Sequence, residues 1–310
     1  MRDRNNMVTV LMSTYNGEKY LKEQIDSILS QVDVDVRLVI RDDGSTDNTV
    51  GVIKEYSQRN SNVEFTVGKN IGYANSFLTL IQMAGDSDYY AFSDQDDIWK
   101  KNKLSTAVDK INGIPYVVYA SNLEMVSENG EFIAMKRFDN FKGSVGGVLS
   151  RNRLAGCTMV FGKDVKETIT PVLDNLIHFN TFNYGHDGWL LLCAILYGGQ
   201  IVVDENSYIR YRRHESAVTS SHGGLKKRLK NELRIFWNKD NKRVRIAGFL
   251  LESFSADSEV MKQKAEVLRR ITKYRKSLGM RCKLLFGHDL DTNIPAVDMK
   301  NKIAVLMGRY

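Results

Sequence analysis

Strand-like and helix-like segments alternate through the N-terminal third of the chain, and this alternation limits the possible fold more than any other feature. Apolar runs at residues 8–12, 34–40, 63–67 and 89–93 predict short strands, and stretches with apolar residues at helical spacing separate them. Strands that alternate with helices form a sheet through right-handed crossovers. We therefore predict an α/β fold with a mostly parallel central sheet.

Polar clusters follow the predicted strands. Ser-Thr-Tyr-Asn-Gly at 13–17 follows the first strand, Asp-Asp-Gly-Ser at 42–45 the second, and Asp-Gln-Asp-Asp at 94–97 the fourth. Ligands of parallel sheets bind outside the carboxyl ends of the strands, so we expect these loops to meet at one crevice. No Gly-x-Gly-x-x-Gly follows the first strand and no Gly-x-x-x-x-Gly-Lys-Ser/Thr occurs, which argues against a dinucleotide fingerprint and a P-loop.

The acidic stretch at 94–97 has two interpretations. Three carboxylates in four positions repel one another unless a cation or hydrogen-bond donors compensate them. On extended backbone Asp94 and Asp96 face the same side, as ligands of one hard cation would. The other interpretation makes Asp97 the cap of a helix predicted over residues 100–112. The residues alone leave both open.

The middle of the chain gives weaker signals. It predicts a polar flap at 127–147, a helix at 164–173, and strands at 116–120, 123–126, 156–161, 200–203 and 208–211. His186-Asp187-Gly188 precedes an apolar helix at 190–196, so Asp187 is either a helix cap or a functional carboxylate. His214 ends a cationic run at 210–214, for which a solvated strand edge is the alternative.

Charge is unevenly distributed along the chain. Residues 225–310 hold 21 Lys and Arg against 9 Asp and Glu, whereas residues 1–224 hold 23 against 28. Apolar residues at helical spacing predict one basic amphipathic helix near 225–237 and another near 261–271. These helices either dock on an anionic membrane or pack on the domain or in a homodimer. We therefore expect a domain at 1–224 and a helical basic extension at 225–310.

Several classes of protein are disfavoured by the sequence. No apolar segment approaches the roughly 20 residues that span a bilayer, and the polar start lacks a signal-peptide apolar region, so we expect a cytoplasmic protein. No nucleic-acid recognition module accompanies the basic charge, so nucleic acid is not expected as a partner. Cys157, Cys193 and Cys282 lie scattered in apolar surroundings, which favours core residues over a disulfide or zinc site.

Several motifs follow one another in a family-specific order, and together they are far more specific than any one alone. The motifs are Thr-Tyr-Asn-Gly at 14–17, Asp-Asp-Gly-Ser-Thr-Asp at 42–47, Asn70 with Gly72, Ser-Asp-Gln-Asp-Asp-Ile-Trp at 93–99, His-Asp at 186–187 and Tyr-Arg-Arg-His at 211–214. On these motifs the chain resembles the family-2 inverting glycosyltransferases over about residues 7–220, closest to the bacterial rhamnosyltransferase-like branch that builds cell-surface polysaccharides. The resemblance implies a GT-A-type nucleotide-sugar-binding domain.

The resemblance also implies roles for residues on the donor side. Ser13 and Tyr15 would hold the nucleoside. Asp43 would accept the proton on N3 of the pyrimidine, with Asp42 in support. Asp94 would bind hydroxyls of the ribose or of the sugar.

The remaining implied roles concern the cation and the reaction. Asp96 would bind Mn²⁺ or Mg²⁺ on the donor pyrophosphate, and His214 would be a further ligand, which favours Mn²⁺. Asp187 would be the base that deprotonates the acceptor hydroxyl. Gly188 departs from close relatives, which often carry a bulky residue there, so we expect a wider acceptor side.

The implied function is metal-dependent inverting glycosyl transfer for cell-surface polysaccharide biosynthesis. The sugar would be L-rhamnose from dTDP-rhamnose, or otherwise a hexose from a UDP-hexose, and the acceptor a glycan or a lipid-linked glycan. A lipid-linked acceptor suits a peripheral location on the inner face of the bacterial cell membrane. Two alternatives remain: a nucleotidyltransferase, which uses a similar carboxylate metal site, and a non-catalytic membrane-docked partner with a vestigial nucleotide-sugar site.

Overall fold

The computed structural model describes residues 6–213, 242–255 and 257–310, and within it the chain forms two compact units. We call the first the sheet unit; it comprises residues up to 139, 154–194 and 199–213. The second, the helical unit, comprises residues 140–153, 195–198 and the C-terminal part. The predicted boundary at residue 224 lies outside the described residues.

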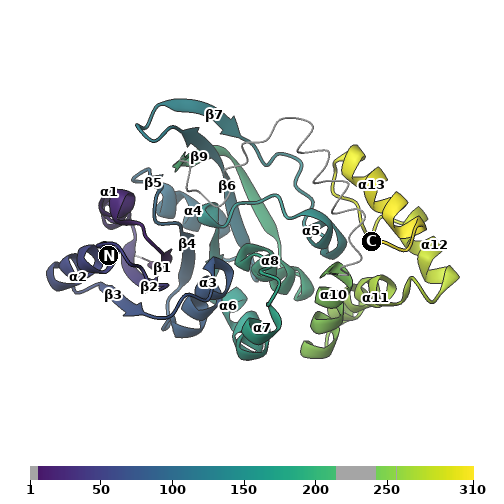
Figure 1. Cartoon of the computed structure of the whole chain (residues 1–310). Coiled ribbons are helices and arrows are strands. Elements are labelled where there is room, and N and C mark those ends of the chain that lie inside the picture. The colour runs from purple at the N-terminus through teal and green to yellow at the C-terminus, as the bar shows by residue number, and fades with distance from the viewer. Residues whose placement is uncertain (1–5, 214–241, 256) are drawn as a thin grey trace. The chain divides into compact units, whose positions relative to one another are not determined.

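The strands of the sheet unit form one mixed sheet with the order β3-β2-β1-β4-β8-β6-β9-β5. The strand β7 pairs with β6, and both are labelled in Figure 1. The strands are β1 (Met7–Thr14), β2 (Asp35–Asp42), β3 (Val63–Val67), β4 (Tyr89–Ser93), β5 (Ile98–Trp99), β6 (Val118–Val126), β7 (Phe132–Lys136), β8 (Val160–Gly162) and β9 (Ile201–Arg212).

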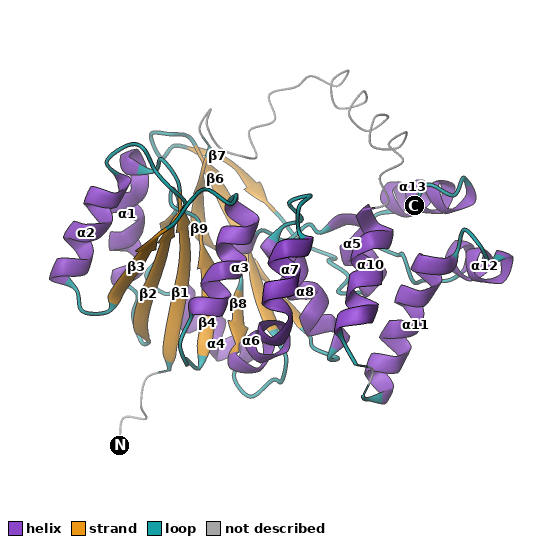
Figure 2. Cartoon of the chain, turned by 60° about the horizontal axis from the view of Figure 1, so that its bottom comes forward, coloured by secondary structure: helices purple, strands orange, loops and turns teal. Residues whose placement is uncertain are grey.

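The α-helices follow the strands in the order that the alternation predicts and then continue alone in the C-terminal part (Figure 2). They are α1 (Glu18–Leu29), α2 (Thr49–Arg59), α3 (Tyr73–Met83), α4 (Lys103–Ile111), α5 (Val145–Arg151), α6 (Lys163–Ile169), α7 (Leu173–Phe179), α8 (His186–Leu196), α10 (Lys242–Ser253), α11 (Glu259–Lys273), α12 (Leu278–Phe286) and α13 (Pro295–Leu306).

The sheet reverses its strand order between β1 and β4. The chain adds β2 and then β3 on one side of β1, and β4 returns to the other side, all in parallel. The register places Thr14 opposite Asp42 and Met12 opposite Ser93, so the three strands end close to one line. Crevices at such reversals are the usual ligand sites of α/β sheets. The topology thus places the loops after β1, β2 and β4 at one edge.

The core forms where the sequence places apolar residues at the period of each element. Leu21, Ile25 and Ile28 lie on one stripe of α1 and are fully buried, and every residue of β4 is buried. Burying one such aliphatic side chain stabilises a fold by roughly 1.5–3 kcal/mol. The parallel sheet is therefore a rigid base for the loops at its edge.

Several predicted elements differ from the structure. The two strands predicted at 116–120 and 123–126 are one strand, β6, and those at 200–203 and 208–211 are one strand, β9. The predicted flap at 127–147 contains strand β7, which pairs with β6 in antiparallel fashion. The helix predicted at 164–173 is two α-helices, α6 and α7, joined by the 3-10 turn Thr170–Val172, and the 3-10 turn Gly156–Thr158 occupies much of the strand predicted at 156–161.

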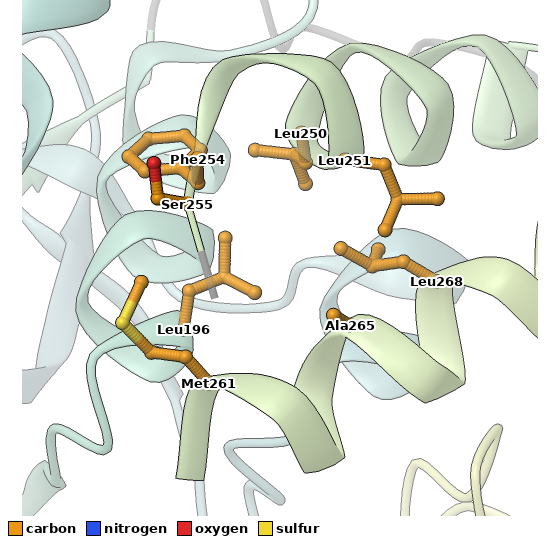
Figure 3. Close-up of a pocket in the computed structure, with 8 residues that line it drawn as sticks. All are labelled: Leu196, Leu250, Leu251, Phe254, Ser255, Met261, Ala265 and Leu268. Carbon is orange, nitrogen blue, oxygen red and sulfur yellow. The ribbon is translucent and has the colours of Figure 1, made fainter. Parts of the chain in front are cut away.

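The helical unit has an apolar interior of its own. The predicted stripe on α11, formed by Met261, Ala265, Leu268 and Ile271, is buried. A small apolar pocket lies between residues of α10 and α11 and Leu196, and Ser255 is the sole polar residue among those that line it (Figure 3). Because its lining has no titratable side chain, the pocket offers no acid, base or metal ligand. Among the described residues, none of the helices is both long and apolar enough to span a membrane.

Candidate functional site

The loops after β1, β2 and β4 are joined by hydrogen bonds at the reversal of the sheet. The Gln95 side chain accepts from the main-chain N–H of Tyr15 (2.8 Å) and donates to the main-chain oxygen of Tyr15 (3.1 Å). The N–H of Asp43 donates to the oxygen of Thr14 (2.8 Å). A Cβ on Gly17 would lie 2.3 Å from Gln95 Oε1, so this contact requires glycine. The expected convergence of the three loops is confirmed.

Asp42 holds the loop after β2 together. Its buried carboxylate accepts hydrogen bonds from Thr14 Oγ1 (3.0 Å) and from the main-chain N–H groups of Gly44 (3.1 Å) and Ser45 (2.9 Å). Gly44 has φ +84°, a conformation that favours glycine. The donors around Asp42 therefore come from the end of β1 and from the loop after β2, so its carboxylate holds that loop in place.

Asp43 lies in a second network that reaches from β1 to the loop before α3. Its buried carboxylate pairs with Arg41 and accepts from the N–H groups of Ile71 (3.0 Å) and Gly72 (2.9 Å). Arg41 also donates to Ser76 Oγ (3.0 Å), which accepts in turn from Ser13 Oγ (2.7 Å). The structure therefore brings Ser13 and Asp43 into one network. Tyr15 lies beside it, with 46% of its surface exposed.

The acidic stretch bends sharply between β4 and β5 instead of remaining extended. The expectation that Asp94 and Asp96 face one side of a strand is therefore wrong. The atoms that approach within 4.8 Å of one another belong to Asp94, Asp97 and Cys157. Burial, followed by the charges of Asp96 and Asp187, raises the pKa of Asp94 to about 7. The carboxylates of this bend thus repel one another, as a site built for a cation would.

Asp97 has a different role from the helix cap that the sequence suggested. The strand β5 intervenes, and α4 begins only at Lys103 with Asn102 as its N-cap. The Asp97 carboxylate is fully buried, accepts from the N–H of Arg212 (3.3 Å) and leaves Oδ2 without a hydrogen-bond partner. Burial, and then the charges of Asp96 and Asp94, raises the pKa of Asp97 well above its usual range.

A buried lysine lies on the inner side of the acidic bend. Lys103 is fully buried, its Nζ has no hydrogen-bond partner, and it lies 3.6 Å from the ring centroid of Trp99. Burial lowers the pKa of Lys103 to about 7, and the charges of Cys157 and Asp97 oppose that shift. A buried charge costs several kcal/mol unless it is compensated. Lys103 therefore lies where its charge interacts with Asp97 and Cys157.

The residues of the bend fit a divalent metal ion. Mg²⁺ and Mn²⁺ prefer carboxylate oxygens, and the bend supplies three carboxylates that repel one another. Cys157 is a softer donor than the carboxylates, and burial raises the pKa of its thiol well above the usual range. Cys157 and Cys193 are buried as expected for core residues, whereas Cys282 is exposed, so that part of the expectation is wrong.

Arg212 fixes the acidic bend from the end of β9. Its Nε donates to the main-chain oxygen of Asp96 (3.1 Å) and its Nη1 to that of Glu128 (2.6 Å), while Nη2 pairs with Glu23. The side chain is buried and stacks over the ring of Tyr20, 4.7 Å from its centroid. The solvated-edge interpretation of the cationic run is therefore wrong for Arg212. His214, the proposed further metal ligand, lies outside the described residues.

Asp187 lies in the first turn of α8, on the same side as the acidic bend. Its charge contributes to the raised pKa of Asp94 and, after burial, to the raised pKa of Tyr73. Asp187 Oδ1 accepts from the N–H of Gly188 (2.7 Å). The fold thus places Asp187 near enough to Asp94 for their charges to interact, although the two residues are far apart in the sequence.

His186 fixes the start of α8 through aromatic packing. Its ring stacks on Phe77 with a centroid distance of 3.9 Å and meets Phe92 edge-on at 4.5 Å. Neither ring nitrogen has a hydrogen-bond partner, and burial lowers the pKa of His186 to about 3, so the imidazole is neutral. A Cβ on Gly156 would lie 2.6 Å from Nε2, so glycine allows this packing.

We expected glycine at position 188 to leave extra space on the acceptor side, and this expectation is wrong. A Cβ on Gly188 would lie 2.7 Å from atoms of the Tyr184 ring, including its hydroxyl. The ring thus occupies the space that a larger residue at 188 would take. Tyr184 also meets Trp189 edge-on, with centroids 5.2 Å apart.

Sequence reasoning missed Gln95, Lys103, Cys157 and Arg212 at this site, and it missed Arg41 and Ser76 in the Asp43 network. Gln95 and Arg212 lie inside motifs that the sequence did single out, so a motif signal was available for both. Lys103 and Cys157 carried no such signal, because burial and pairing between distant segments appear only in the fold.

Comparisons with known proteins agree with this architecture. A family model described as "Glycosyl transferase family 2" matches residues 9–170. The dTDP-rhamnosyl transferase RfbG of Shigella flexneri is 30% identical over 230 residues, 71% of this chain and 77% of that protein. The UDP-Glc:alpha-D-GlcNAc-diphosphoundecaprenol beta-1,3-glucosyltransferase WfgD of Escherichia coli is 28% identical over 225 residues, 69% of this chain and 80% of that protein.

A solved structure supports the fold. The crystal structure of residues 1–349 of S. aureus TarS in complex with UDP-GlcNAc aligns with a TM-score of 0.54 and 19% identity, covering 98% of this chain and 93% of that one. At this level of identity the likeness concerns the fold alone, and it confirms the expected GT-A-type architecture.

Proposed function

The chain belongs to glycosyl transferase family 2, and on this premise we propose that it is a metal-dependent inverting enzyme that transfers one sugar from a nucleotide donor to a cell-surface glycan. The observation that carries the proposal is the meeting of the Tyr15, Asp43 and Asp94 loops at the reversal of the sheet, beside Asp187. Family membership decides against the alternative of a nucleotidyltransferase.

We assign the donor nucleoside to the loops after β1 and β2. The exposed ring of Tyr15 is available to stack on the base, and the network of Ser13, Ser76, Arg41 and Asp43 is a polar wall beside it. Asp43 retains acceptor capacity for the N3 proton of a pyrimidine, because a carboxylate has about four lone-pair sites. Asp42 supports it by holding the loop in place.

We assign the donor diphosphate to the acidic bend. Asp96 would hold Mn²⁺ or Mg²⁺ and Asp94 would bind donor hydroxyls, while Arg212 holds the main chain of the bend in place. When bound, the cation neutralises the charge that develops on the departing nucleoside diphosphate, an effect of several kcal/mol. His214 remains a proposed further ligand.

We assign the base to Asp187. A carboxylate beside the donor side can take the proton of an acceptor hydroxyl, and a positioned base contributes about 10²- to 10⁴-fold. Attack by the acceptor from the face opposite the leaving group inverts the anomeric carbon and needs no covalent intermediate. The neutral, stacked His186 would hold the first turn of α8 so that Asp187 keeps its direction.

We infer the substrate class from the relatives. The name of RfbG favours dTDP-rhamnose as the donor, and that of WfgD makes a UDP-hexose the alternative and an undecaprenyl-linked glycan the acceptor class. An acceptor of this kind would bring the protein to the inner face of the bacterial membrane.

A donor panel tests the proposal. The protein would be incubated with dTDP- and UDP-sugars and Mn²⁺, with and without a lipid-linked acceptor, and release of the nucleoside diphosphate would be measured. We expect one donor to be turned over, and turnover to stop when the metal is chelated. Binding of no nucleotide sugar at all would refute the proposal and favour a vestigial site.

A further inference from the structure

The helix α12 has an exposed apolar stripe. Leu278, Cys282 and Phe286 recur every four residues, so they lie on one side of the helix. Leu278 is 76% exposed, Phe286 is 83% exposed, and Cys282 is exposed as well. Large apolar side chains that are this exposed and lined up on one helix face are unusual on a protein surface, where single ones are normal.

The neighbouring helix α13 has a second such stripe. Met299, Ile303 and Leu306 lie at helical spacing, and they are 63%, 43% and 63% exposed. The opposite side of α13 is buried through Ala304 and Val305. A surface helix ordinarily has polar residues on its outer side. The apolar outer side of α13 is therefore not explained by packing within the helical unit.

Basic charge accompanies the two stripes. Residues 274–310 contain seven Lys and Arg and three Asp. Each of the three carboxylates has a partner within the helical unit: Asp289 pairs with Arg270 (2.8 Å), Asp291 with His288 (2.6 Å), and Asp298 accepts from Thr292 (2.7 Å). Lys276 and Lys283, in contrast, are exposed next to the α12 stripe. The surface is therefore apolar and positive.

We propose that these residues form a membrane-docking surface, defined by the stripes of α12 and α13 and the basic residues beside them, which binds an anionic lipid bilayer. Apolar side chains at the outer side of basic helices insert between headgroups, and Lys and Arg add attraction to anionic lipid. A second copy of the chain suits the surface less well, because a symmetric dimer would bring its basic residues face to face. The surface deepens the proposed function and rests on it, since it names where the enzyme would meet the membrane that carries its acceptor.

Vesicle flotation of the full chain tests the surface. We expect wild-type protein to float with vesicles of phosphatidylcholine and phosphatidylglycerol, to float poorly with phosphatidylcholine alone, and to be released by salt. Leu278→Ser with Phe286→Ser, and separately Met299→Ser with Leu306→Ser, should lower the partition coefficient by about tenfold or more. Lys276→Glu with Lys283→Glu should weaken binding to the anionic vesicles and leave the weak binding to phosphatidylcholine vesicles unchanged.

A matched control uses another exposed apolar side chain. Phe132 on β7 in the sheet unit is 62% exposed, and Phe132→Ser should leave vesicle binding unchanged. Wild-type flotation that is absent, or that the α12 and α13 variants leave intact, would overturn the proposal. Analytical ultracentrifugation gives a second way to overturn it. If the wild-type protein is a dimer and the α12 and α13 variants are monomers, a second copy of the chain covers the surface.

Donor hydrolysis without vesicles separates this proposal from the proposed function. All surface variants should hydrolyse the donor at the wild-type rate, since their substitutions lie in the helical unit and outside the candidate site. If wild-type protein binds anionic vesicles but no nucleotide sugar, the proposed function fails and the docking surface stands. If it turns over the donor but does not bind vesicles, the docking surface fails and the proposed function stands.

Discussion

Arg212 and Asp96 are joined through the main chain: Nε of the arginine donates to the carbonyl oxygen of the aspartate at 3.1 Å. The N–H of Arg212 also donates to the carboxylate of Asp97 at 3.3 Å. The last residue of β9 thus fixes the bend after β4, although 115 residues separate Arg212 from Asp97. The contact holds the main chain at Asp96, the residue that we propose as the metal ligand.

Arg212→Met should therefore weaken binding of the nucleotide sugar, although we do not place Arg212 in contact with it. The substitution keeps much of the side-chain length and removes the guanidinium N–H groups that bind Asp96, Glu128 and Glu23. We expect the dissociation constant for the nucleotide sugar with Mn²⁺ to rise by about tenfold, which corresponds to 1.4 kcal/mol. The control is Arg210→Met on the same strand, where the guanidinium pairs with Glu124 instead. Equal donor affinity in both variants and in the wild type would show that Arg212 has no positioning role.

Asp187→Asn separates binding from turnover. The amide keeps the shape of the side chain but does not accept the acceptor's proton, so kcat should fall by about 10²- to 10⁴-fold while donor affinity stays within a factor of about two. Asp174→Asn, in the first turn of α7, is the control and should keep wild-type turnover. Wild-type kcat in Asp187→Asn would remove the residue from the role of base.

Gly188→Ala should disturb the protein through Tyr184. The new methyl group would overlap the tyrosine ring, and overpacking of this kind costs typically about 1–3 kcal/mol of unfolding free energy. Chemical denaturation of Gly188→Ala, Tyr184→Ala and the double variant measures the coupling between the two positions. We expect Tyr184→Ala to relieve much of the penalty, whereas additive effects would mean that the ring does not occupy this space.

His186 should make the fold sensitive to acid. Its pKa is lowered from 6.5 to about 3 by burial, so between these values the unfolded chain binds a proton that the folded chain does not. The neutral imidazole therefore causes no loss of unfolding free energy above about pH 6.5. As the pH drops from 6.5 toward 3, the free energy of unfolding falls by at most about 1.4 kcal/mol per pH unit because of this group.

Urea denaturation at pH 7.5 and 5.0 measures that effect. His186→Leu removes the titrating group, so the loss of unfolding free energy between the two pH values should be smaller than in the wild type, even if the variant is less stable at both. His178→Leu, at an exposed position on α7, is the control and should keep the wild-type difference. An unchanged difference in His186→Leu would contradict a neutral buried imidazole.

The sequence predicted the elements of the parallel sheet well because their signals are local. The strands β3 and β4 match the predicted runs at 63–67 and 89–93 to the residue. The strand β6 was predicted as two pieces, and its register against β9 is irregular near Asn122, where the prediction placed the break. The polar residues at 204–207 divided β9 in the same way.

The candidate site was predictable only in part, because its geometry depends on contacts between distant segments. Asp42 and Asp43 lie where the loop pattern predicted, but the bend of residues 94–97 changes which carboxylates approach each other. Lys103 lies in the helix predicted at 100–112 with nothing in the sequence to mark it as buried, and only the fold shows its packing on Trp99. Burial of polar groups follows from tertiary packing, which spacing along the chain does not encode.

Metal-dependent donor binding through Asp96 is the central claim, and calorimetric titration tests it most directly. The donor found by the panel would be titrated into wild-type protein and into Asp96→Ala, each with Mn²⁺ and with a chelator. We predict that wild-type binding requires Mn²⁺ and that Asp96→Ala binds at least about tenfold more weakly, a loss of 1.4 kcal/mol or more. Equal affinity with and without Mn²⁺, and in Asp96→Ala, would contradict the account.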